Sequence, residues 1–364
     1  MRMLPALGAV GAVTLALAGC AGPTGQQDVE PGSAGDRLEI VATTTQLADV
    51  TRELVGDAAY VTSLLRPGAS AHAFDPGPTA LAALASADLL VINGAGLEGW
   101  LDSTVEASGF DGTTVDTSGG LDLIAAEDDP HEGHDHADHA DAAHDEAAHD
   151  DETAEEHAAH DDEADPGHDH EGHDHGEFDP HVWTDPANVL VQAETIRDAV
   201  TAADPDADIA ASAEAYLARL ADLDAWMRAS IEQVPTDERR IVTTHDTFGY
   251  LERAFDVQVV GTVLPSLDDS AGASAAHIDE LVAEIRATGT RVVFSENAID
   301  PQLAGTIARE AGVELRQGAD ALAADALGPE DSDTGTYIGA QIHNTSTIVT
   351  AWGAEPLPLP ESLA

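Results

Sequence analysis

The stretch RLEIVATTTQLADVTRELVGDAAYVTSLL, residues 37–65, contains one complete strand–helix–strand unit. Its first part, LEIVAT, and its last part, AYVTSLL, are short runs rich in β-branched and apolar residues, which is typical of strands. The segment between them, TQLADVTRELVG, is helix-like and ends in glycine. Because a helix that joins two strands in this way places them parallel in one sheet, the stretch predicts an α/β fold.

The alternation of strands and helices continues on both sides of a central helical region. The helix-like TALAALASAD precedes the buried strand LLVIN, and a second series begins near residue 240 with RRIVTTH, VQVVGTVL and RVVFSE. A single core stops growing at about 250–300 residues, and this chain has 364. We therefore predict two Rossmann-like α/β lobes, an N-terminal lobe at 38–185 and a C-terminal lobe at 236–364.

The region between the lobes, 186–235, is rich in Ala, Leu and Glu. Its second half, DADIAASAEAYLARLADLDAWMRASIEQVP, places apolar residues at roughly helical intervals. These residues are Ile209, Tyr216, Leu220, Leu223 and Met227. We interpret the region as connecting helices that include one long helix between the lobes; the alternative is a two-helix hairpin within one lobe.

The first 37 residues carry the features of an export signal followed by a linker. A charged start and an apolar stretch precede LAGC, which ends at Cys20, the only cysteine. This sequence resembles a bacterial lipobox. We therefore predict that residues 1–19 are a lipoprotein signal peptide and that Cys20 is the lipidated first residue of the mature protein. Residues 20–37 are predicted to be a flexible linker. The alternative is a short membrane anchor with a chance cysteine. The prediction places the protein outside the cytoplasm, anchored to the outer face of the cytoplasmic membrane.

The charge balance restricts the partners. The formal net charge is −55, and a polyanion repels phosphate backbones, which argues against nucleic acid. The same charge attracts cations. We expect a monomer.

Residues 127–176 form an acidic, histidine-rich tract inside the N-terminal lobe. The tract holds His131, His134, His136, His139, His144, His149, His157, His160, His168, His170, His173 and His175. With almost no large apolar residue, the tract cannot bury enough surface to offset its ordering entropy, which predicts disorder, and its composition is that of a metal-binding tract. We expect weak, auxiliary metal sites here; the alternative is an acidic solubilising insert.

Five histidines lie outside the tract. His72 lies in a Gly/Pro-rich loop after a strand, and His181 lies in FDPHVWTDP, where two prolines restrict the backbone. His245 follows the strand RRIVTT and therefore lies at the carboxyl end of a strand, where α/β folds place ligands. His277 and His343 fall inside helical segments and are expected to be solvated. His72, His181 and His245 are thus the candidate metal ligands.

Three imidazoles and one carboxylate form a donor set that suits tetrahedral zinc. The acidic candidates in the second lobe are Glu296, Asp320, Asp325, and Asp331 or Asp333. Periodicity alone does not choose among them. Asp185 and Asp246, which lie close in sequence to His181 and His245, are candidates to orient those histidines, although an aspartate beside a helix start usually caps it.

Two short motifs point to other chemistry but lack its context. Gly94, Gly96 and Gly99 formally match a dinucleotide-binding fingerprint, yet they follow a late strand of the lobe, and a tight turn suffices to explain them. HEGH at 131–134 is one residue short of the HExxH motif of metalloproteases, so its histidines would not share a helical face.

Five segments in this order resemble the zinc and manganese solute-binding lipoproteins of bacterial ABC transporters, the metal-binding cluster A-I. They are RPGASAHAFDPGPT, NGAGLEGWL, FDPHVWTDP, TTHDTFGYLERAFDV and DALGPEDSDTGTYIGAQIHN. The resemblance runs from about residue 38 to the end, apart from the tract. It implies two α/β lobes joined by one long rigid helix, with the metal in the cleft between them.

The motifs of that family imply metal ligands at His72 in H-x-F-D-P, His181 in D-P-H-V-W and His245 in T-x-H-x-x-F-x-Y. Manganese members typically have glutamate at the third place, so His245 favours zinc, in agreement with ligand softness.

The fourth ligand of the family is an aspartate twelve residues before the tyrosine of a Y-x6-N segment. Tyr337 and Asn344 keep that spacing, which implies Asp325, with Glu296 as the reserve candidate. The sequence departs from the family where Gln341 and Ile342 replace a common pair of methionines. It also lacks the cysteine pair of some members.

The resemblance implies an extracytoplasmic receptor that captures Zn²⁺ and delivers it to a cognate ABC permease. A receptor for manganese or another divalent metal is the main alternative. An exported zinc hydrolase, with three histidines and Glu296 at its metal, is a second alternative, and a metal-storage or adhesion protein without a permease is a third.

Overall fold

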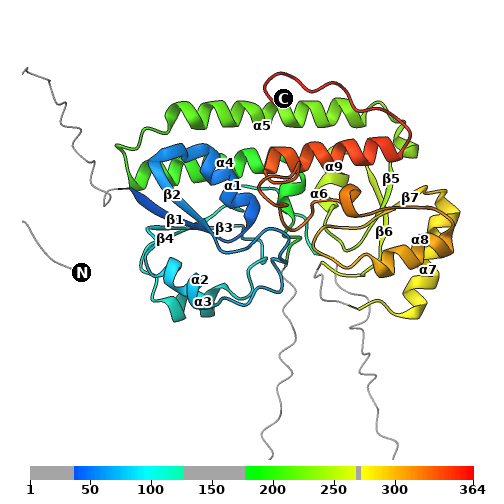
Figure 1. Ribbon diagram of the computed structural model, residues 1–364, viewed down its shortest axis with the longest axis horizontal. Coiled ribbons are helices and arrows are strands. Elements are labelled where there is room, and N and C mark those ends of the chain that lie inside the picture. The colour runs from blue at the N-terminus through cyan, green and yellow to red at the C-terminus, as the bar shows by residue number, and fades with distance from the viewer. Residues whose placement is uncertain (1–36, 127–176, 268–271) are drawn as a thin grey trace, which may run out of the picture. The chain divides into compact units, whose positions relative to one another are not determined.

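The computed structural model describes residues 37–126, 177–267 and 272–364 (Figure 1). The predicted signal peptide, Cys20, nearly all of the linker and the twelve tract histidines lie outside these ranges. Within the described ranges, no helix is both long enough and apolar enough to cross a membrane.

The N-terminal lobe is built on one parallel sheet. Its strands are β1 (Leu38–Ala42), β2 (Ala59–Ser63), β3 (Leu89–Ile92) and β4 (Thr113–Asp116), in the spatial order β2-β1-β3-β4. Its helices are α1 (Thr45–Val55), α2 (Pro78–Leu84) and α3 (Leu101–Ser108). Ile40 of β1 lies beside Val61 of β2 and Leu89 of β3, and all these pairings are parallel. The strand–helix–strand prediction for residues 37–65 is therefore confirmed.

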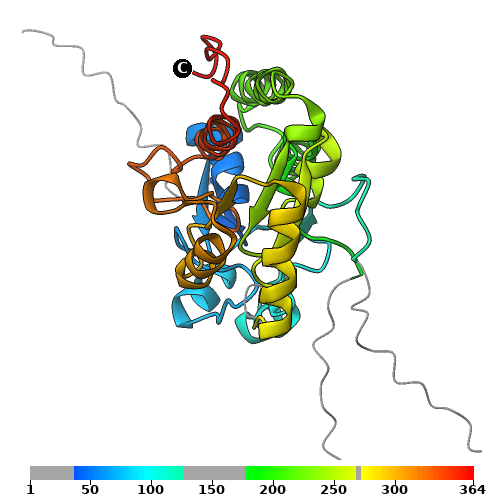
Figure 2. The ribbon, with the colours of Figure 1, turned by 90° about the vertical axis from the view of Figure 1, so that its right-hand side faces the viewer.

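The C-terminal lobe repeats the α/β pattern with shorter strands. They are β5 (Arg240–Thr243), β6 (Gln258–Thr262), β7 (Val292–Phe294) and β8 (Glu314–Arg316), with parallel pairs β5-β6 and β7-β8. The helices are α6 (Gly249–Phe255), α7 (Ala275–Thr288), α8 (Gln302–Ala311) and α9 (Tyr337–Ala351). Contacts between β5 and β7 bring the two pairs together, and α7 and α8 lie side by side (Figure 2).

Short 3₁₀ turns occur in both lobes, at Gly56–Ala58, Val182–Thr184, Thr236–Glu238 and Gly318–Asp320.

Successive strand residues point to opposite faces, and both faces are covered. On β1, Ile40 and Ala42 join a large core that also includes residues of α1, α4, α5 and α9, whereas Val41 joins a smaller core on the side of α2 and α3. On β7, Val293 packs with residues of α7 and α8. The central strands β1, β3, β5 and β7 are therefore largely buried, and each appears in the sequence as a mostly apolar run.

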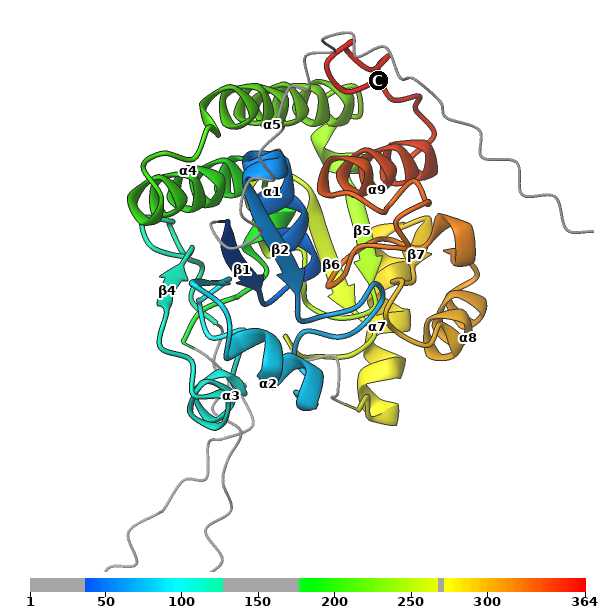
Figure 3. The same cartoon turned by 60° about the vertical axis from the view of Figure 1, so that its left-hand side comes forward.

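Two helices join the lobes, α4 (Pro186–Ala203) and α5 (Ala210–Ile231). They pack against each other, and α5 also packs against α1 of the N-terminal lobe and α9 of the C-terminal lobe (Figure 3). The apolar residues predicted to form the buried face of α5 and its start are all buried: Ile209, Tyr216, Leu220, Leu223 and Met227. The long connecting helix is therefore present, and its contacts are not those of a hairpin confined to one lobe.

The glycine-rich turn after β3 is closed by its own glutamate. Gly94 has φ +76°, and a Cβ there would lie 2.2 Å from Asp116 Oδ1. The Glu98 carboxylate accepts hydrogen bonds from the backbone N–H groups of Asn93 at 2.7 Å and Gly94 at 3.1 Å. The N–H groups at the start of the motif are thus occupied by a carboxylate of the same segment, as in a self-contained tight turn.

Candidate metal centre

Four separate segments bring their side chains to one point. His72 lies in the loop between β2 and α2, and His181 directly precedes the 3₁₀ turn that leads into α4. His245 follows β5, and Asp325 lies between β8 and α9. Loops at the carboxyl ends of parallel strands are where α/β folds bind ligands. The ring centroid of His181 lies 5.1 Å from that of His72 and 5.3 Å from that of His245.

The potential ligand atoms of these four residues all lie within 4.8 Å of one another. The Nε2 atoms of His72 and His181 are 3.1 Å apart. Asp325 Oδ1 lies 3.3 Å from His245 Nε2 and 3.7 Å from His181 Nε2, and Oδ2 lies 3.7 Å from His72 Nε2. A tetrahedral zinc ion with Zn–N distances of about 2.0–2.1 Å holds its ligand atoms about 3.3 Å apart. The cluster therefore has the dimensions of a four-ligand metal site.

Two histidines are each held by a carboxylate at Nδ1. Asp179 Oδ1 lies 2.8 Å from His181 Nδ1 and also accepts the backbone N–H of His181 at 2.9 Å. Glu296 Oε2 lies 2.6 Å from His245 Nδ1, and Oε1 accepts the backbone N–H of His245 at 3.0 Å. A carboxylate at Nδ1 fixes the tautomer in which Nε2 carries the lone pair. Both rings thus present Nε2 to the cluster.

The cluster is largely removed from solvent, and its histidines and carboxylates act on one another's protonation. His181, His245 and Asp325 are each 0 % exposed. Burial alone would lower the pKa of His245, but the carboxylates of Glu296 and Asp325 outweigh burial and raise this pKa well above its usual range. Burial would raise the pKa of Asp325, but the neighbouring histidines, His245 first, hold it below its ordinary value. Protons and a metal ion therefore compete for the same atoms.

The segment that carries Asp325 is hydrogen-bonded to the N-terminal lobe. The carbonyl oxygen of Ala324 accepts from Trp183 Nε1 at 2.9 Å and from Gln46 Nε2 at 3.1 Å. Trp183 in turn accepts, at its own carbonyl oxygen, the hydroxyl of Tyr337 at 2.8 Å. Because Trp183 is two residues from His181, these bonds set the distance between ligands of different lobes.

Three of the sequence assignments need correction or refinement. Asp185 does not orient His181; it caps α4 by accepting the N–H of Ala187 at 2.9 Å. Asp246, the candidate to orient His245, is exposed. The carboxylate found at His245 Nδ1 belongs to Glu296. Glu296 therefore stands behind a histidine, and it is not among the four clustered residues.

The remaining candidates lie outside the cluster. His277 and His343 are partly buried and not simply solvated, since their Nε2 atoms lie 2.8 Å from the carbonyl oxygen of Thr262 and 2.9 Å from that of Ala321. Asp320 forms an ion pair with an arginine, at 3.2 Å. Asp331 and Asp333 are exposed.

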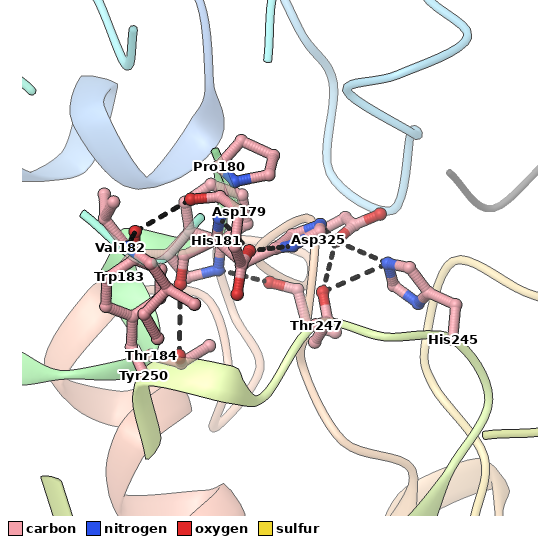
Figure 4. Close-up of polar contacts among 12 residues, drawn as sticks. Asp179, Pro180, His181, Val182, Trp183, Thr184, His245, Thr247, Tyr250 and Asp325 are labelled. Atoms are coloured by element: carbon pink, nitrogen blue, oxygen red, sulfur yellow. Dashed lines mark hydrogen bonds and ion pairs between the residues drawn. The ribbon is translucent and has the colours of Figure 1, made fainter. Parts of the chain in front are cut away.

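The sequence did not indicate two side chains that contact the clustered residues. Asp179 stands two residues before His181 in the motif that identified the histidine, and this spacing was the available signal. Thr247 places its hydroxyl 3.0 Å from His245 Nε2 and 3.2 Å from Asp325 Oδ1 (Figure 4). Nothing in the sequence indicated that contact, because it depends on where the segment of Asp325 folds.

Neither lobe completes the ligand set alone, and the donor atoms of the four residues all lie close to one another. An α/β protein of this design, with a buried ligand set between two lobes, is a metal-binding solute-binding protein, the class of receptor that serves ABC uptake systems.

The chain belongs to the family described as zinc-uptake complex component A periplasmic, whose sequence profile it matches over residues 40–351. It is 27% identical over 340 residues to the manganese-binding lipoprotein MntA of Halalkalibacterium halodurans, covering 93% of this chain and 95% of that one. It is 25% identical over 325 residues to the iron-binding protein YfeA of Yersinia pestis, covering 89% of each. The solved structure of the periplasmic zinc-binding protein TroA from Treponema pallidum matches with a TM-score of 0.68 at 22% identity, covering 87% of this chain and 99% of that one, and so shares the fold.

Proposed function

We propose that the protein captures Zn²⁺ outside the cytoplasmic membrane and delivers it to a cognate ABC permease, with His72, His181, His245 and Asp325 as the zinc ligands. The observation that carries the proposal is the approach of four donor atoms, from both lobes, to within 4.8 Å of one another. Two of the rings are already fixed with Nε2 toward the cluster. Such a site binds its metal without first paying to order its ligands.

Zinc is favoured over other metals by the donor set. Three imidazoles with one carboxylate suit a tetrahedral, borderline-soft ion, whereas manganese prefers oxygen ligands and more of them. MntA is named for manganese and YfeA for iron, so a receptor for another divalent metal is the alternative. A direct competition between zinc and manganese for the purified protein separates the two.

The hydrolase alternative is not supported. A zinc hydrolase needs a general base that faces the metal-bound water. The candidate base, Glu296, has Oε1 at two backbone N–H groups and Oε2 at His245 Nδ1. The chain also belongs to an uptake family. We therefore assign binding and delivery of the metal, not catalysis.

We further propose that Cys20 is lipidated and anchors the protein to the outer face of the membrane. The proposal rests on the LAGC sequence and on the lipoprotein name of MntA. Cells given a radioactive fatty acid should incorporate the label into the wild-type protein and not into the Cys20→Ala variant.

For the tract we propose several weak zinc sites that raise the local zinc concentration near the cluster. The two described residues that flank the tract lie side by side, because the backbone N–H of Ala126 donates to the carbonyl oxygen of Glu177 at 3.0 Å. Deletion of 128–176 should slow zinc uptake in severely zinc-starved cells. Unchanged uptake would leave the tract as a solubilising insert.

The ligand assignment is tested by His245→Ala, with His277→Ala as its control. We expect the first variant to lose at least about tenfold in zinc affinity, since one of four ligands is gone. The second should bind zinc like the wild type, because its ring contacts a backbone carbonyl away from the cluster. An unchanged dissociation constant in the first variant would remove His245 from the site.

A further inference from the structure

We propose that Tyr250 and Tyr337 are positioning residues for the metal centre. Their hydroxyls hold the backbone on both sides of His181 against the C-terminal lobe, so that this histidine keeps its distance from the other ligands whether or not a metal is bound. The inference rests on the proposed function, since it takes His181, His245 and Asp325 as ligands. Neither tyrosine belongs to the cluster of potential ligands, so their role is to place a ligand and not to bind the metal.

The segment from residue 179 to residue 183 carries His181 and has little regular structure of its own. Only its end belongs to the 3₁₀ turn Val182–Thr184. Each backbone carbonyl oxygen of the segment accepts a hydrogen bond from a side chain. The donors, in the order of these carbonyl oxygens, are Tyr250, Asn93, Thr184, Asn188 and Tyr337. The position of the segment is therefore set largely by side chains of other elements.

The donors at the two ends of the segment come from the C-terminal lobe. The hydroxyl of Tyr250, at the start of α6, donates to the carbonyl oxygen of Asp179 at 2.8 Å (Figure 4). The hydroxyl of Tyr337, at the start of α9, donates to the carbonyl oxygen of Trp183 at 2.8 Å. Both tyrosines are 0 % exposed, and a buried hydrogen bond is costly to break. The C-terminal lobe thus holds the backbone on each side of His181.

Tyr250 is itself fixed by its surroundings. Its hydroxyl also accepts the backbone N–H of Ile124 at 3.1 Å, so the oxygen acts as donor and as acceptor. The guanidinium of Arg253 lies over its ring, 5.0 Å from the centroid. A Cβ at Gly249 would lie 2.7 Å from Asp179 Oδ2, so the lack of a side chain there lets α6 approach this carboxylate closely. The hydroxyl of Tyr250 is therefore a fixed point for the segment.

The bond from Tyr250 joins the segments that carry two ligands of different lobes. Tyr250 follows His245 closely in the chain, and Asp179 precedes His181, whose ring centroid lies 5.3 Å from that of His245. The contact of Asp179 with the ring of His181 orients that ring. That contact lies within one segment, however, and cannot set the distance between the two histidines. A bond that sets this distance in advance reduces the ordering cost of metal binding.

The first test compares Tyr250→Phe, which keeps the ring and removes the hydroxyl, with Tyr216→Phe as its control. The hydroxyl of Tyr216 on α5 is also buried, but it has no hydrogen-bond partner among the residues that the structure describes. Each full-length protein receives at most one equivalent of zinc, so that the tightest site fills first, and a chelator competes for the metal. Zinc affinity should fall about fivefold in Tyr250→Phe, the value of one hydrogen bond, and stay unchanged in Tyr216→Phe.

Tyr337→Phe should have a smaller effect, about twofold, because Gln341 Nε2 still donates to the carbonyl oxygen of Trp183 at 3.2 Å. The double variant Tyr337→Phe with Gln341→Met removes both donors to that oxygen. It should lose about fivefold in zinc affinity. If Tyr250→Phe does not fold, this double variant carries the same expectations.

Hydrogen exchange of the backbone amides gives a readout that general destabilisation would not imitate. In the metal-free wild type, the amides of residues 179–185 should exchange slowly, and zinc should change their rates little. In metal-free Tyr250→Phe these amides should exchange about fivefold faster, and zinc should restore slow exchange. The amides of β1, in the core of the N-terminal lobe, should exchange alike in both proteins.

The outcomes separate this inference from the proposed function. If the wild type binds zinc tightly but Tyr250→Phe keeps either the wild-type affinity or the wild-type exchange at 179–185, the role of the tyrosines is wrong and the receptor assignment stands. The same conclusion follows if β1 exchanges faster by the same factor, or if Tyr216→Phe loses as much affinity as Tyr250→Phe. If the wild type has no tight zinc site, both proposals are wrong.

Discussion

The two lobes hold their histidines with the same kind of contact, but they build it differently. In the N-terminal lobe, Asp179 is two residues from His181, and its Oδ1 alone contacts both the backbone N–H and the ring of that histidine. In the C-terminal lobe, Glu296 is 51 residues from His245. There, Oε1 holds the backbone N–H groups of Thr244 and His245, and Oε2 holds the ring.

This difference shows which ligand depends on the tertiary structure. The first contact is contained in FDPHVWTDP, whose prolines restrict the backbone, so it forms wherever the segment folds. The second contact requires the end of β7 to lie beside the end of β5. It also needs both carboxylate oxygens, so it tolerates less chemical change than the first.

The largest expected effect is that of Glu296→Gln. A glutamine keeps one oxygen for the backbone N–H groups but turns an NH₂ toward His245 Nδ1, which favours the tautomer with a proton on Nε2. In that tautomer Nε2 of His245 has no lone pair to offer a metal, so zinc affinity should fall about 10- to 100-fold. Isothermal titration with a competing chelator measures the fall.

Glu98→Gln is the matched control for this variant. Glu98 also accepts backbone N–H groups and a hydroxyl at a loop after a strand, but the contacts found for it include no histidine. Its substitution should leave zinc affinity unchanged. Equal losses in both variants would show that general loop disorder, and not the tautomer of His245, is the cause.

An intermediate effect is expected when the contact between the lobes is weakened. Trp183→Phe removes the indole N–H that donates to Ala324, while Gln46 still bonds that carbonyl oxygen. Asp325 should become less well fixed relative to His181, and zinc affinity should fall about fivefold, the value of one hydrogen bond. Stopped-flow release of zinc to a chelator should show the change in the dissociation rate.

Trp226→Phe controls for the loss of an indole hydrogen bond elsewhere. Trp226 donates to the carbonyl oxygen of Leu357 in the C-terminal segment at 2.9 Å. This variant should lose stability but release zinc at the wild-type rate. Faster release from it would contradict a specific role for Trp183.

A smaller effect is expected for Asp179→Asn. The Oδ1 of asparagine can still accept both the backbone N–H and the Nδ1–H of His181, so the tautomer is kept. Zinc affinity should fall about threefold, because the partner is no longer charged. The ratio of this loss to that of Glu296→Gln tests the comparison of the two lobes, and similar losses would break it.

The last variant is expected to change stability and to have no effect on zinc affinity. Asp49 of α1 accepts the backbone N–H of Tyr337 of α9 at 2.8 Å, and burial raises the pKa of Asp49 from 3.8 to about 6. The folded state therefore holds this proton more tightly than the unfolded state, and stability is lost as pH rises from about 4 to about 6.

Asp49→Asn should remove that loss. Thermal unfolding should show equal stability of the variant and the wild type near pH 4, and an advantage for the variant of about 1–2 kcal/mol at pH 7. Zinc affinity should not change, since this contact between the lobes does not touch the cluster. An advantage that does not depend on pH would contradict the raised pKa.

The sequence predicted the parts of the molecule that are local. The β1–α1–β2 unit was visible because two short runs rich in β-branched residues flank a helix-like segment, and the buried face of α5 followed from helical spacing. His72, His181 and His245 stand on restricted loops or at strand ends, and the structure brings them together. Asp325 came from the family resemblance, since periodicity could not separate it from the other acids.

What the sequence did not predict depends on long-range contacts. The sequence makes Glu296 a reserve ligand, because nothing local shows that β7 ends behind His245. It also makes Asp185 a candidate to orient His181, whereas Asp185 caps α4. The contact between Thr247 and Asp325 forms only when the segment of Asp325 is folded against Thr247.

The most direct test of the central claim is a zinc titration of the mature protein without Cys20, intact and with 128–176 deleted. The deletion should close without strain, since Ala126 and Glu177 are already hydrogen-bonded. Our account predicts one tight site of the same affinity in both proteins, with only weak sites lost from the second. If the tight site disappeared with the tract, the cluster of His72, His181, His245 and Asp325 would not be the receptor site.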